Sequence, residues 1–156
     1  MQHLYTFYLS LGSNLGEREE TLRSALQLIG QQIGKVTRCS SFFYSEPWGF
    51  QSDHAFCNLC CAVETPLEPL EMLSATQSIE RTLGRTTKSV NGIYHDRPID
   101  IDPIRAFDPA GNEIITKNDQ MVNAQLVNVL TLPHPLYRQR DFVTIPLREI
   151  CPNFEN

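Results

Sequence analysis

Two aspartates, Asp100 and Asp102, flank a single isoleucine in a segment whose polar and apolar residues alternate. In a β-strand such residues share one face, with Cα atoms about 7 Å apart. Their carboxylates could hold one divalent ion, or bracket two ions about 3.5–4 Å apart. Magnesium is the natural candidate, because this hard cation suits sites that combine carboxylates with substrate phosphates. The alternative is a solvated strand face, since acidic pairs are common on protein surfaces.

Positive charges gather around this pair of aspartates. The segment from Arg81 to Arg105 has a net charge of +2, whereas the whole chain carries −5. Its bases are Arg81, Arg85, Lys88, Arg97 and Arg105, and its acids are Asp96, Asp100 and Asp102. Cations beside a carboxylate pair are typical of a polyphosphate site, because arginine donates paired hydrogen bonds to phosphate oxygens. For any single arginine, an ordinary surface ion pair is the alternative.

A second group of residues could recognise an aromatic heterocycle. Asn58 lies among apolar residues, and its amide can donate and accept hydrogen bonds at the polar edge of a ring. Phe56, on the same strand face, could cover such a ring, and Phe142, close to Arg140, could lie against its other side. The alternatives are a hydrogen-bonded strand amide and two core aromatic residues.

The motifs of several nucleotide-binding classes are absent from the sequence. It contains no G-x-x-x-x-G-K-[ST] segment, no G-x-G-x-x-G after a strand and no protein-kinase motif set. Phosphates would therefore be held by side-chain cations and metal, with the loop at 88–96 closing over them. His95 and His134 could each act as an acid, but the sequence does not indicate a Ser-His-Asp or Cys-His pairing. The C-x-x-C at Cys57 and Cys60 lacks a second ligand pair, so all five cysteines are expected to be buried free thiols.

Hydrophobic periodicity predicts the elements that must position these residues. Apolar or alternating segments predict strands at 4–11, 36–44, 55–64 and 99–107. Helical spacing predicts one helix between residues 14 and 33, a second that starts at 66–69 and ends at 84, and a third at 142–150. Pro103 predicts an edge strand or a bulge, and residues 113–115 are expected to pair back as a hairpin. Residues 131–135 are expected to form a constrained loop.

The order strand-helix-strand-strand-helix-strand predicts an α+β fold of the ferredoxin-like βαββαβ type. We expect an antiparallel sheet with helices on one face and active-site loops on the other. In this arrangement the polar faces of the strands that carry Asn58 and Asp100 look into the same cleft.

Composition places the chain among globular proteins and limits its partners. With 156 residues, 41% hydrophobic and 20% charged, it has the size and composition of a single domain, 1–156. A net charge of −5 argues against nucleic-acid binding. The sequence contains no apolar run of membrane-spanning length and no secretory signal, so we expect a cytoplasmic protein that does not bind membranes.

The motifs, taken in order, resemble the 6-hydroxymethyl-7,8-dihydropterin pyrophosphokinase family of folate biosynthesis. The resemblance runs along nearly the whole chain, and the ordered set is highly specific. The matching segments are Ser10-Leu-Gly-Ser-Asn-Leu15, Ser40-Ser-Phe-Phe-Tyr44 with Pro47-x-Gly49, Phe56-x-Asn58, Gln77-x-x-Ile-Glu80 with Leu83-Gly-Arg85, Asp96-Arg-Pro-Ile-Asp-Ile-Asp102, Leu132-Pro-His134 and Arg140-x-Phe142. The chain departs from the family pattern at Thr87, Pro103 and Pro135.

This resemblance implies a monomer that transfers pyrophosphate from ATP to the hydroxymethyl oxygen of the pterin and releases AMP. Asp100 and Asp102 would hold two magnesium ions, and Arg85 and Arg97 would act with them in catalysis. The other implied residues bind substrates: Leu73, Gln77, Glu80, Arg85, Lys88, Arg97, Thr131, His134 and Arg140 on the ATP side, and Glu46, Pro47, Gly49, Phe56, Asn58 and Phe142 on the pterin side.

Two other functions are compatible with the residues alone. A non-catalytic ferredoxin-like module that senses nucleotides would bind ATP without forming AMP and without needing both aspartates. A metal-dependent phosphohydrolase would release phosphate without the pterin. Measuring AMP with and without the pterin distinguishes all three functions.

Overall fold

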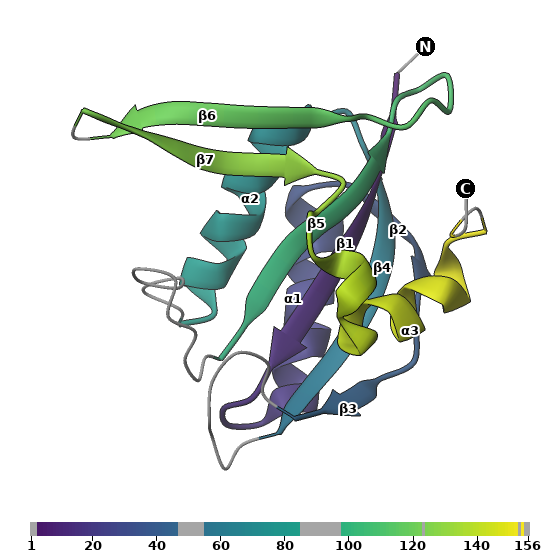
Figure 1. Cartoon of the computed structure of the whole chain (residues 1–156). Coiled ribbons are helices and arrows are strands. Elements are labelled where there is room, and N and C mark those ends of the chain that lie inside the picture. The colour runs from purple at the N-terminus through teal and green to yellow at the C-terminus, as the bar shows by residue number, and fades with distance from the viewer. Residues whose placement is uncertain (1–2, 47–54, 85–97, 123, 153, 155–156) are drawn as a thin grey trace.

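The computed structural model describes residues 3–46, 55–84, 98–122, 124–152 and 154 of the chain. They form a larger antiparallel sheet with helices on both faces, and a separate two-stranded hairpin (Figure 1). The elements in chain order are β1 (Tyr5–Ser13), α1 (Arg18–Gln32), β2 (Lys35–Cys39), β3 (Phe43–Ser45), β4 (Phe56–Thr65), α2 (Pro69–Thr82), β5 (Asp100–Phe107), β6 (Thr116–Val122), β7 (Gln125–Leu132), a 3-10 turn (Tyr137–Gln139) and α3 (Asp141–Ile150).

The larger sheet has the strand order β2-β4-β1-β5, and β3 also pairs with β4. Every pairing in it is antiparallel, as the sequence predicted. The strand predicted at 36–44 is two strands, because Ser40 interrupts the ladder. Its hydroxyl accepts a hydrogen bond from the Cys60 amide at 2.9 Å, which takes the place of a backbone acceptor.

One face of the sheet packs against α1 and α2 and carries the main core. Phe7, Leu9 and Leu11 of β1 alternate with residues that face the other way, as the period of two in a strand requires. Leu22 and Ile29 of α1, with further apolar residues of α2, cover them. The apolar periodicity of the sequence predicted this core.

The opposite face is partly covered by α3, so the expectation of helices on one face only is wrong. Val143, Leu147 and Ile150 form an apolar stripe on α3 and pack against Tyr8 and Ile104 of the sheet. Residues at these spacings share one side of a helix, and this stripe needs an apolar surface to cover it. Figure 1 shows α3 in front of the sheet, with α1 and α2 behind it.

Strand β5 lies at an edge of the sheet and also contains a bulge, whereas Pro103 predicted one or the other. Leu9 pairs with Pro103 and Tyr8 pairs with Arg105, so Ile104 is the extra residue. Proline has no amide hydrogen to donate, and an edge position or a bulge accommodates that loss.

The β6–β7 hairpin was not predicted. The strand β6 reads TKNDQMV, and its Lys117, Asn118 and Asp119 are of types that are depleted in strands. The predicted return at 113–115 is limited to a single bridge between Phe107 and Glu113. Threonine and leucine at 131–132 end β7 instead of starting a loop, and a cis peptide bond joins Leu132 to Pro133.

All five cysteines are free thiols, as predicted. Cys57, Cys60, Cys61 and Cys151 are buried, whereas Cys39 is exposed, so the prediction of burial is wrong for Cys39. Within the described ranges, no helix has the length and apolar character needed to cross a membrane.

Candidate active site

The central strand β1 brings the two predicted groups of polar residues onto one face. Gly12 lies directly opposite Asn58 on β4 and directly opposite Asp100 on β5. Ser10 lies opposite Asp102. Residues opposite one another in antiparallel strands share a face, and neighbouring strands are about 4.8 Å apart. Asn58 and Asp100 therefore stand about 10 Å apart across Gly12, on the face that α1 and α2 leave open.

Asp100 and Asp102 are both half-buried, and Ile101 between them is buried in the main core. This alternation aims both carboxylates away from the core, as predicted. The described residues contain no group of three or more histidine, cysteine or acidic side chains that could hold a metal. A cation at this position would take two protein carboxylates and complete its coordination with other oxygens.

Glu80 fixes the backbone between the two aspartates. It comes from α2, is only 2% exposed, and accepts a hydrogen bond from the Ile101 amide through Oε2 at 2.7 Å. Because β5 is an edge strand, this amide has no neighbouring strand to donate to. The family resemblance implied an ATP contact for Glu80. In the structure, the Glu80 carboxylate also holds the backbone of β5 between the two aspartates.

Gln77 and Leu73 lie about one and two turns before Glu80 on α2, and both are half-buried. The spacings 73, 77 and 80 put the three residues on one side of the helix. Since Glu80 contacts β5, this side faces the edge of the sheet that carries the aspartates. Leu73, Gln77 and Glu80 therefore lie on the side of α2 that faces β5.

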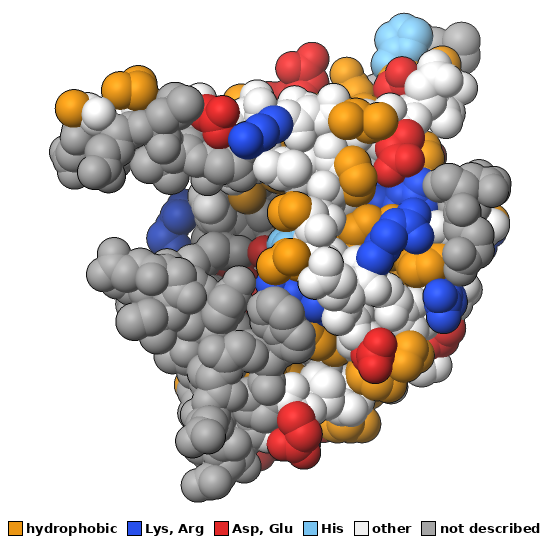
Figure 2. Space-filling view, in the orientation of Figure 1, with side chains coloured by type: hydrophobic (Ala, Val, Ile, Leu, Met, Phe, Trp, Pro, Cys, Tyr) orange, Lys and Arg blue, Asp and Glu red, His pale blue; other side chains and the backbone are white. Residues whose placement is uncertain are grey.

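One backbone hydrogen bond holds His134 beside β5, and a second orients its ring. Its own amide donates to the Ile104 carbonyl at 2.8 Å, and its Nδ1 accepts from the Leu136 amide at 3.2 Å. An accepting Nδ1 places the ring proton on Nε2 in the neutral imidazole. Thr131, in β7, is half-buried. Figure 2 shows a recessed surface below the β6–β7 hairpin, where acidic, basic and histidine side chains emerge.

Asn58 is 2% exposed, and its amide nitrogen is already used within the protein. Nδ2 donates to the Phe43 carbonyl at 3.0 Å and to the Ser45 hydroxyl at 2.8 Å, both on β3. These bonds orient the amide, so that Oδ1 lies over Gly12 on the open face. The sequence suggested that Asn58 both donates to and accepts from a ligand, but the structure leaves only its oxygen for this task.

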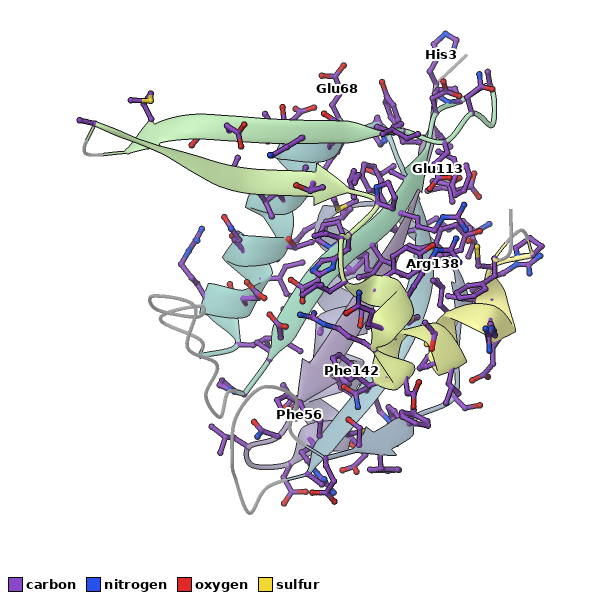
Figure 3. The ribbon with its side chains drawn as sticks, viewed as in Figure 1. His3, Phe56, Glu68, Glu113, Arg138 and Phe142 are labelled. Atoms are coloured by element: carbon purple, nitrogen blue, oxygen red, sulfur yellow. The ribbon has the colours of Figure 1, made fainter. Side chains whose placement is uncertain are left out.

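The two aromatic residues come from different elements. Phe56, at the start of β4, is 7% exposed and lies close to Gly12. Phe142 is half-buried in the first turn of α3, and the Arg140 guanidinium lies 5.8 Å from its ring centroid. Figure 3 shows both rings at the end of the sheet face that α3 leaves uncovered.

Arg18, Glu19 and Tyr44, none of which the sequence assigned to the site, connect β3 and the start of β4 to α1. Arg18 of α1 donates through Nη1 to the Ala55 carbonyl at 2.8 Å, and its guanidinium lies 5.4 Å from the Tyr44 ring centroid. The Tyr44 hydroxyl donates to Glu19 Oε1 at 3.0 Å, and this bond raises the pKa of Tyr44. We call this set, Arg18, Glu19, Tyr44 and Ala55, the β3–β4 junction. Only the charged first turn of α1 hinted at it.

Arg105 is not available to a ligand, which corrects the count of positive charges near the aspartates. It is 2% exposed, and its Nε and Nη2 donate to the two carboxylate oxygens of Glu113 at 2.9 Å each. This hydrogen-bonded pairing raises the pKa of Arg105. Sequence proximity could not show this pairing, because Glu113 lies across a turn from the strand.

The other predicted site residues divide into exposed and undescribed positions. Glu46 is exposed directly after β3. The remaining predicted positions lie outside the described residues: Pro47, Gly49, Arg85, Thr87, Lys88, His95 and Arg97. Most of the predicted cations therefore stay predictions.

Comparisons with known proteins identify the family of the chain. Residues 8–152 match the family model of 7,8-dihydro-6-hydroxymethylpterin-pyrophosphokinase (HPPK). Over 145 residues the chain is 45% identical to a 2-amino-4-hydroxy-6-hydroxymethyldihydropteridine pyrophosphokinase from Porphyromonas gingivalis, covering 93% of this chain and 90% of that protein. The namesake enzyme of Bacillus subtilis is 36% identical over 149 residues, which cover 95% of this chain and 79% of that protein.

A solved structure shares the fold at low sequence identity. The crystal structure of a Plasmodium falciparum HPPK-DHPS triple mutant superposes with a TM-score of 0.68 at 16% identity. The superposition covers 93% of this chain but only 40% of that longer chain. With the sequence matches over most of its length, the chain belongs to the HPPK family.

Proposed function

We propose that this chain transfers pyrophosphate from ATP to the hydroxymethyl oxygen of 6-hydroxymethyl-7,8-dihydropterin, giving AMP and the pterin diphosphate in folate biosynthesis. The family membership and the curated relatives, which are named for this activity, support the reaction. The observation that carries the proposal is the single sheet face on which Asn58, Gly12 and Asp100 stand in a row. We further propose that the chain acts as a single-domain cytoplasmic monomer.

The strand order supports assigning the fold to the ferredoxin-like class. The elements β1, α1, β2, β4, α2 and β5 follow the βαββαβ order, and the sheet order is β2-β4-β1-β5. In this class two antiparallel βαβ-type halves share one sheet. The β6–β7 hairpin and α3 are then additions to this unit.

Asp100 and Asp102 would hold two magnesium ions. The fit rests on two half-buried carboxylates on one face, with no third acidic, cysteine or histidine ligand clustered beside them in the described residues. Magnesium suits such sites because it commonly takes one or two carboxylates and completes its shell with phosphate oxygens and water. When bound, these ions would neutralise the charge on the phosphate oxygens.

The pterin would lie over the other end of this face. Asn58 Oδ1 would accept a hydrogen bond from the ring edge, and Phe56 and Phe142 would cover the two faces of the ring. Glu46, Pro47 and Gly49 complete the proposed pterin side. The orientation of Asn58 by β3 supports this assignment, because a fixed acceptor recognises a ring edge without further ordering.

The nucleotide would lie along β5 and α2. His134 would donate from Nε2 to a phosphate oxygen, and Arg140 would supply a positive charge beside the Phe142 ring. Leu73, Gln77, Glu80, Thr131 and the cations Arg85, Lys88 and Arg97 complete the proposed ATP side. Attack on the β-phosphorus builds negative charge on oxygens that these groups can stabilise, without a covalent intermediate and without a strong general base.

The reaction is tested by incubating the protein with ATP and magnesium and measuring AMP with and without the pterin. We expect pterin-dependent AMP. Asp100→Asn and Asp102→Asn should each lower turnover by at least about 1000-fold, because each removes a charge that holds the phosphate-bound cation. Glu20→Gln, which removes an exposed charge on α1, is the matched control and should leave turnover unchanged.

The outcome also separates the rival functions. AMP that forms without the pterin, or nucleotide binding with no AMP at all, would contradict the transferase. Full turnover in Asp100→Asn with magnesium present would contradict the metal assignment alone.

A further inference from the structure

Gly12 is a glycine whose backbone conformation does not require glycine. It is the next-to-last residue of β1 and pairs with a neighbouring strand on each side. Gly16, Gly84 and Gly111 have positive φ values of 66°, 100° and 90°, respectively, but Gly12 does not have a positive φ. A glycine inside a strand costs roughly 0.5–1 kcal/mol relative to alanine, so another property must account for this residue.

The space beside Gly12 supplies that property. A Cβ atom at this position would lie 3.0 Å from Asn58 Oδ1 and 3.4 Å and 3.8 Å from two ring atoms of Phe56. Asn58 cannot move away without breaking its two hydrogen bonds to β3, and Phe56 is buried. The atoms that crowd this Cβ are thus the two proposed pterin-binding side chains, held in place by the fold.

Two other glycines show that this surrounding is particular to Gly12. A Cβ at Gly34 would meet the Glu64 carbonyl oxygen at 2.0 Å, so Gly34 is required by close backbone packing. A Cβ at Gly30, on the exposed side of α1, would meet nothing within 4 Å. Gly12 differs from both, because a Cβ atom there would meet the side chains of Asn58 and Phe56 and not backbone or solvent.

We propose that Gly12 is a specificity-determining residue whose bare Cα forms the floor between the pterin half and the phosphate half of the site. The ligand segment above it would be the hydroxymethyl group, since this group links the ring near Asn58 to the phosphate near Asp100. The contact is a close van der Waals approach of the ligand to the backbone, a recognised reason for glycine in a strand. This inference rests on the proposed function.

The test compares Gly12→Ala with the matched control Gly30→Ala. The pterin and a non-hydrolysable ATP analogue are titrated separately and together by calorimetry, with magnesium present. We expect Gly12→Ala to weaken pterin binding at least about 10-fold, as overpacking at a fixed site does, and to leave analogue binding within about 2-fold. Gly30→Ala should change neither affinity. Retained analogue binding shows that the variant is folded.

A second measurement uses the wild-type protein and needs no folded variant. With 15N-labelled glycine, addition of the pterin should shift the Gly12 amide resonance and leave the Gly30 resonance in place. Wild-type pterin affinity in Gly12→Ala, or an unmoved Gly12 resonance in a protein that binds the pterin, overturns this inference alone. Wild-type protein that binds no pterin under any of these conditions overturns the proposed function as well.

Discussion

The two halves of the proposed active site are held by different parts of the fold. On the pterin side, Asn58 lies in β4, which has strands on both edges, and its amide nitrogen is bound to β3. On the phosphate side, Asp100 and Asp102 lie in the edge strand β5, whose backbone is held by the Glu80 side chain. The strand of the pterin half is paired along both edges, whereas the strand of the phosphate half is paired with β1 along one edge and is held by a helix side chain on the other.

This difference suits the two ligands. A flat, rigid ring is recognised by an acceptor and aromatic faces that are fixed before it binds. A flexible, highly charged phosphate chain needs carboxylates and cations with room for coordinating oxygens. Changes in one half should therefore affect one ligand more than the other, and the following experiments test this separation in order of expected size.

The largest effect is expected at Asn58. Asn58→Leu removes the oxygen that would accept from the ring edge, so pterin affinity should fall about 100-fold, as loss of a buried polar contact can cost. Affinity for the ATP analogue should stay within about 2-fold, because the aspartates are two strands away. Ser45→Ala removes only one of the two acceptors that orient the Asn58 amide, and it should lower the affinity for the pterin about 3-fold. Equal losses for both ligands, measured by calorimetry, would show that the halves are not separate.

A smaller effect is expected at Glu80, on the phosphate side. Glu80→Leu leaves the buried Ile101 amide without this acceptor, which should lower the free energy of unfolding by roughly 1–3 kcal/mol and reduce turnover about 10-fold at limiting magnesium. Glu80→Gln keeps an acceptor oxygen, so it should retain most of the free energy of unfolding and most of the turnover. Urea denaturation and magnesium titrations measure the two properties. If Glu80→Gln is as damaging as Glu80→Leu, the charge of Glu80 matters and not its hydrogen bond.

The β3–β4 junction should give a modest effect confined to the pterin. Arg18→Met removes the hydrogen bond to the Ala55 carbonyl and should raise the KM for the pterin about 3-fold with the KM for ATP unchanged. Arg23→Met is the matched control: Arg23 also lies on α1, pairs with Glu20 and faces the Phe42 ring, but it does not contact Ala55. Identical pterin KM values in the two variants would exclude a positioning role for Arg18.

The smallest effect is the pH dependence of the Tyr44–Glu19 bond. A hydrogen bond from its own backbone amide, followed by the one from the Tyr44 hydroxyl, lowers the pKa of Glu19. A lowered folded-state pKa stabilises the protein above the ordinary carboxyl range, and this contribution is lost as the pH falls through the lowered value. Wild type should therefore exceed Tyr44→Phe in thermal stability at neutral pH, and the two should converge in acid. A constant difference across this range would contradict the assignment.

The sequence alone predicted the structural features that depend on neighbouring residues in the chain. The alternation at Asp100, Ile101 and Asp102 predicted that both carboxylates leave the core, and the register confirms this geometry. Pro103 predicted an edge strand or a bulge, because a missing amide hydrogen limits where a proline can lie in a sheet, and β5 has both features. The apolar stripes of the first two helices predicted the main core for the same reason.

Features that depend on distant partners could not be read in this way. The polar strand β6 pairs with β7, although its Lys117, Asn118 and Asp119 are of types that disfavour strands. Arg105 contributes to the positive charge that the sequence predicts near the aspartates, but in the structure its guanidinium is paired with Glu113. The prediction that all helices cover one face was wrong for α3, since an apolar stripe shows that a helix is covered but not by which surface.

The extra residue in β5 has a consequence for how the strand divides its charges. Asp102 and Arg105 are separated by an odd number of positions, so in an unbroken strand they would point to opposite sides, with the arginine directed into the main core. The bulge at Ile104 shifts the phase, and Arg105 turns toward Tyr8 and Glu113 while Ala106 enters the core in its place. If the same residues formed an unbroken strand, either the guanidinium or the acidic pair would be buried, so the bulge allows opposite charges to share one surface.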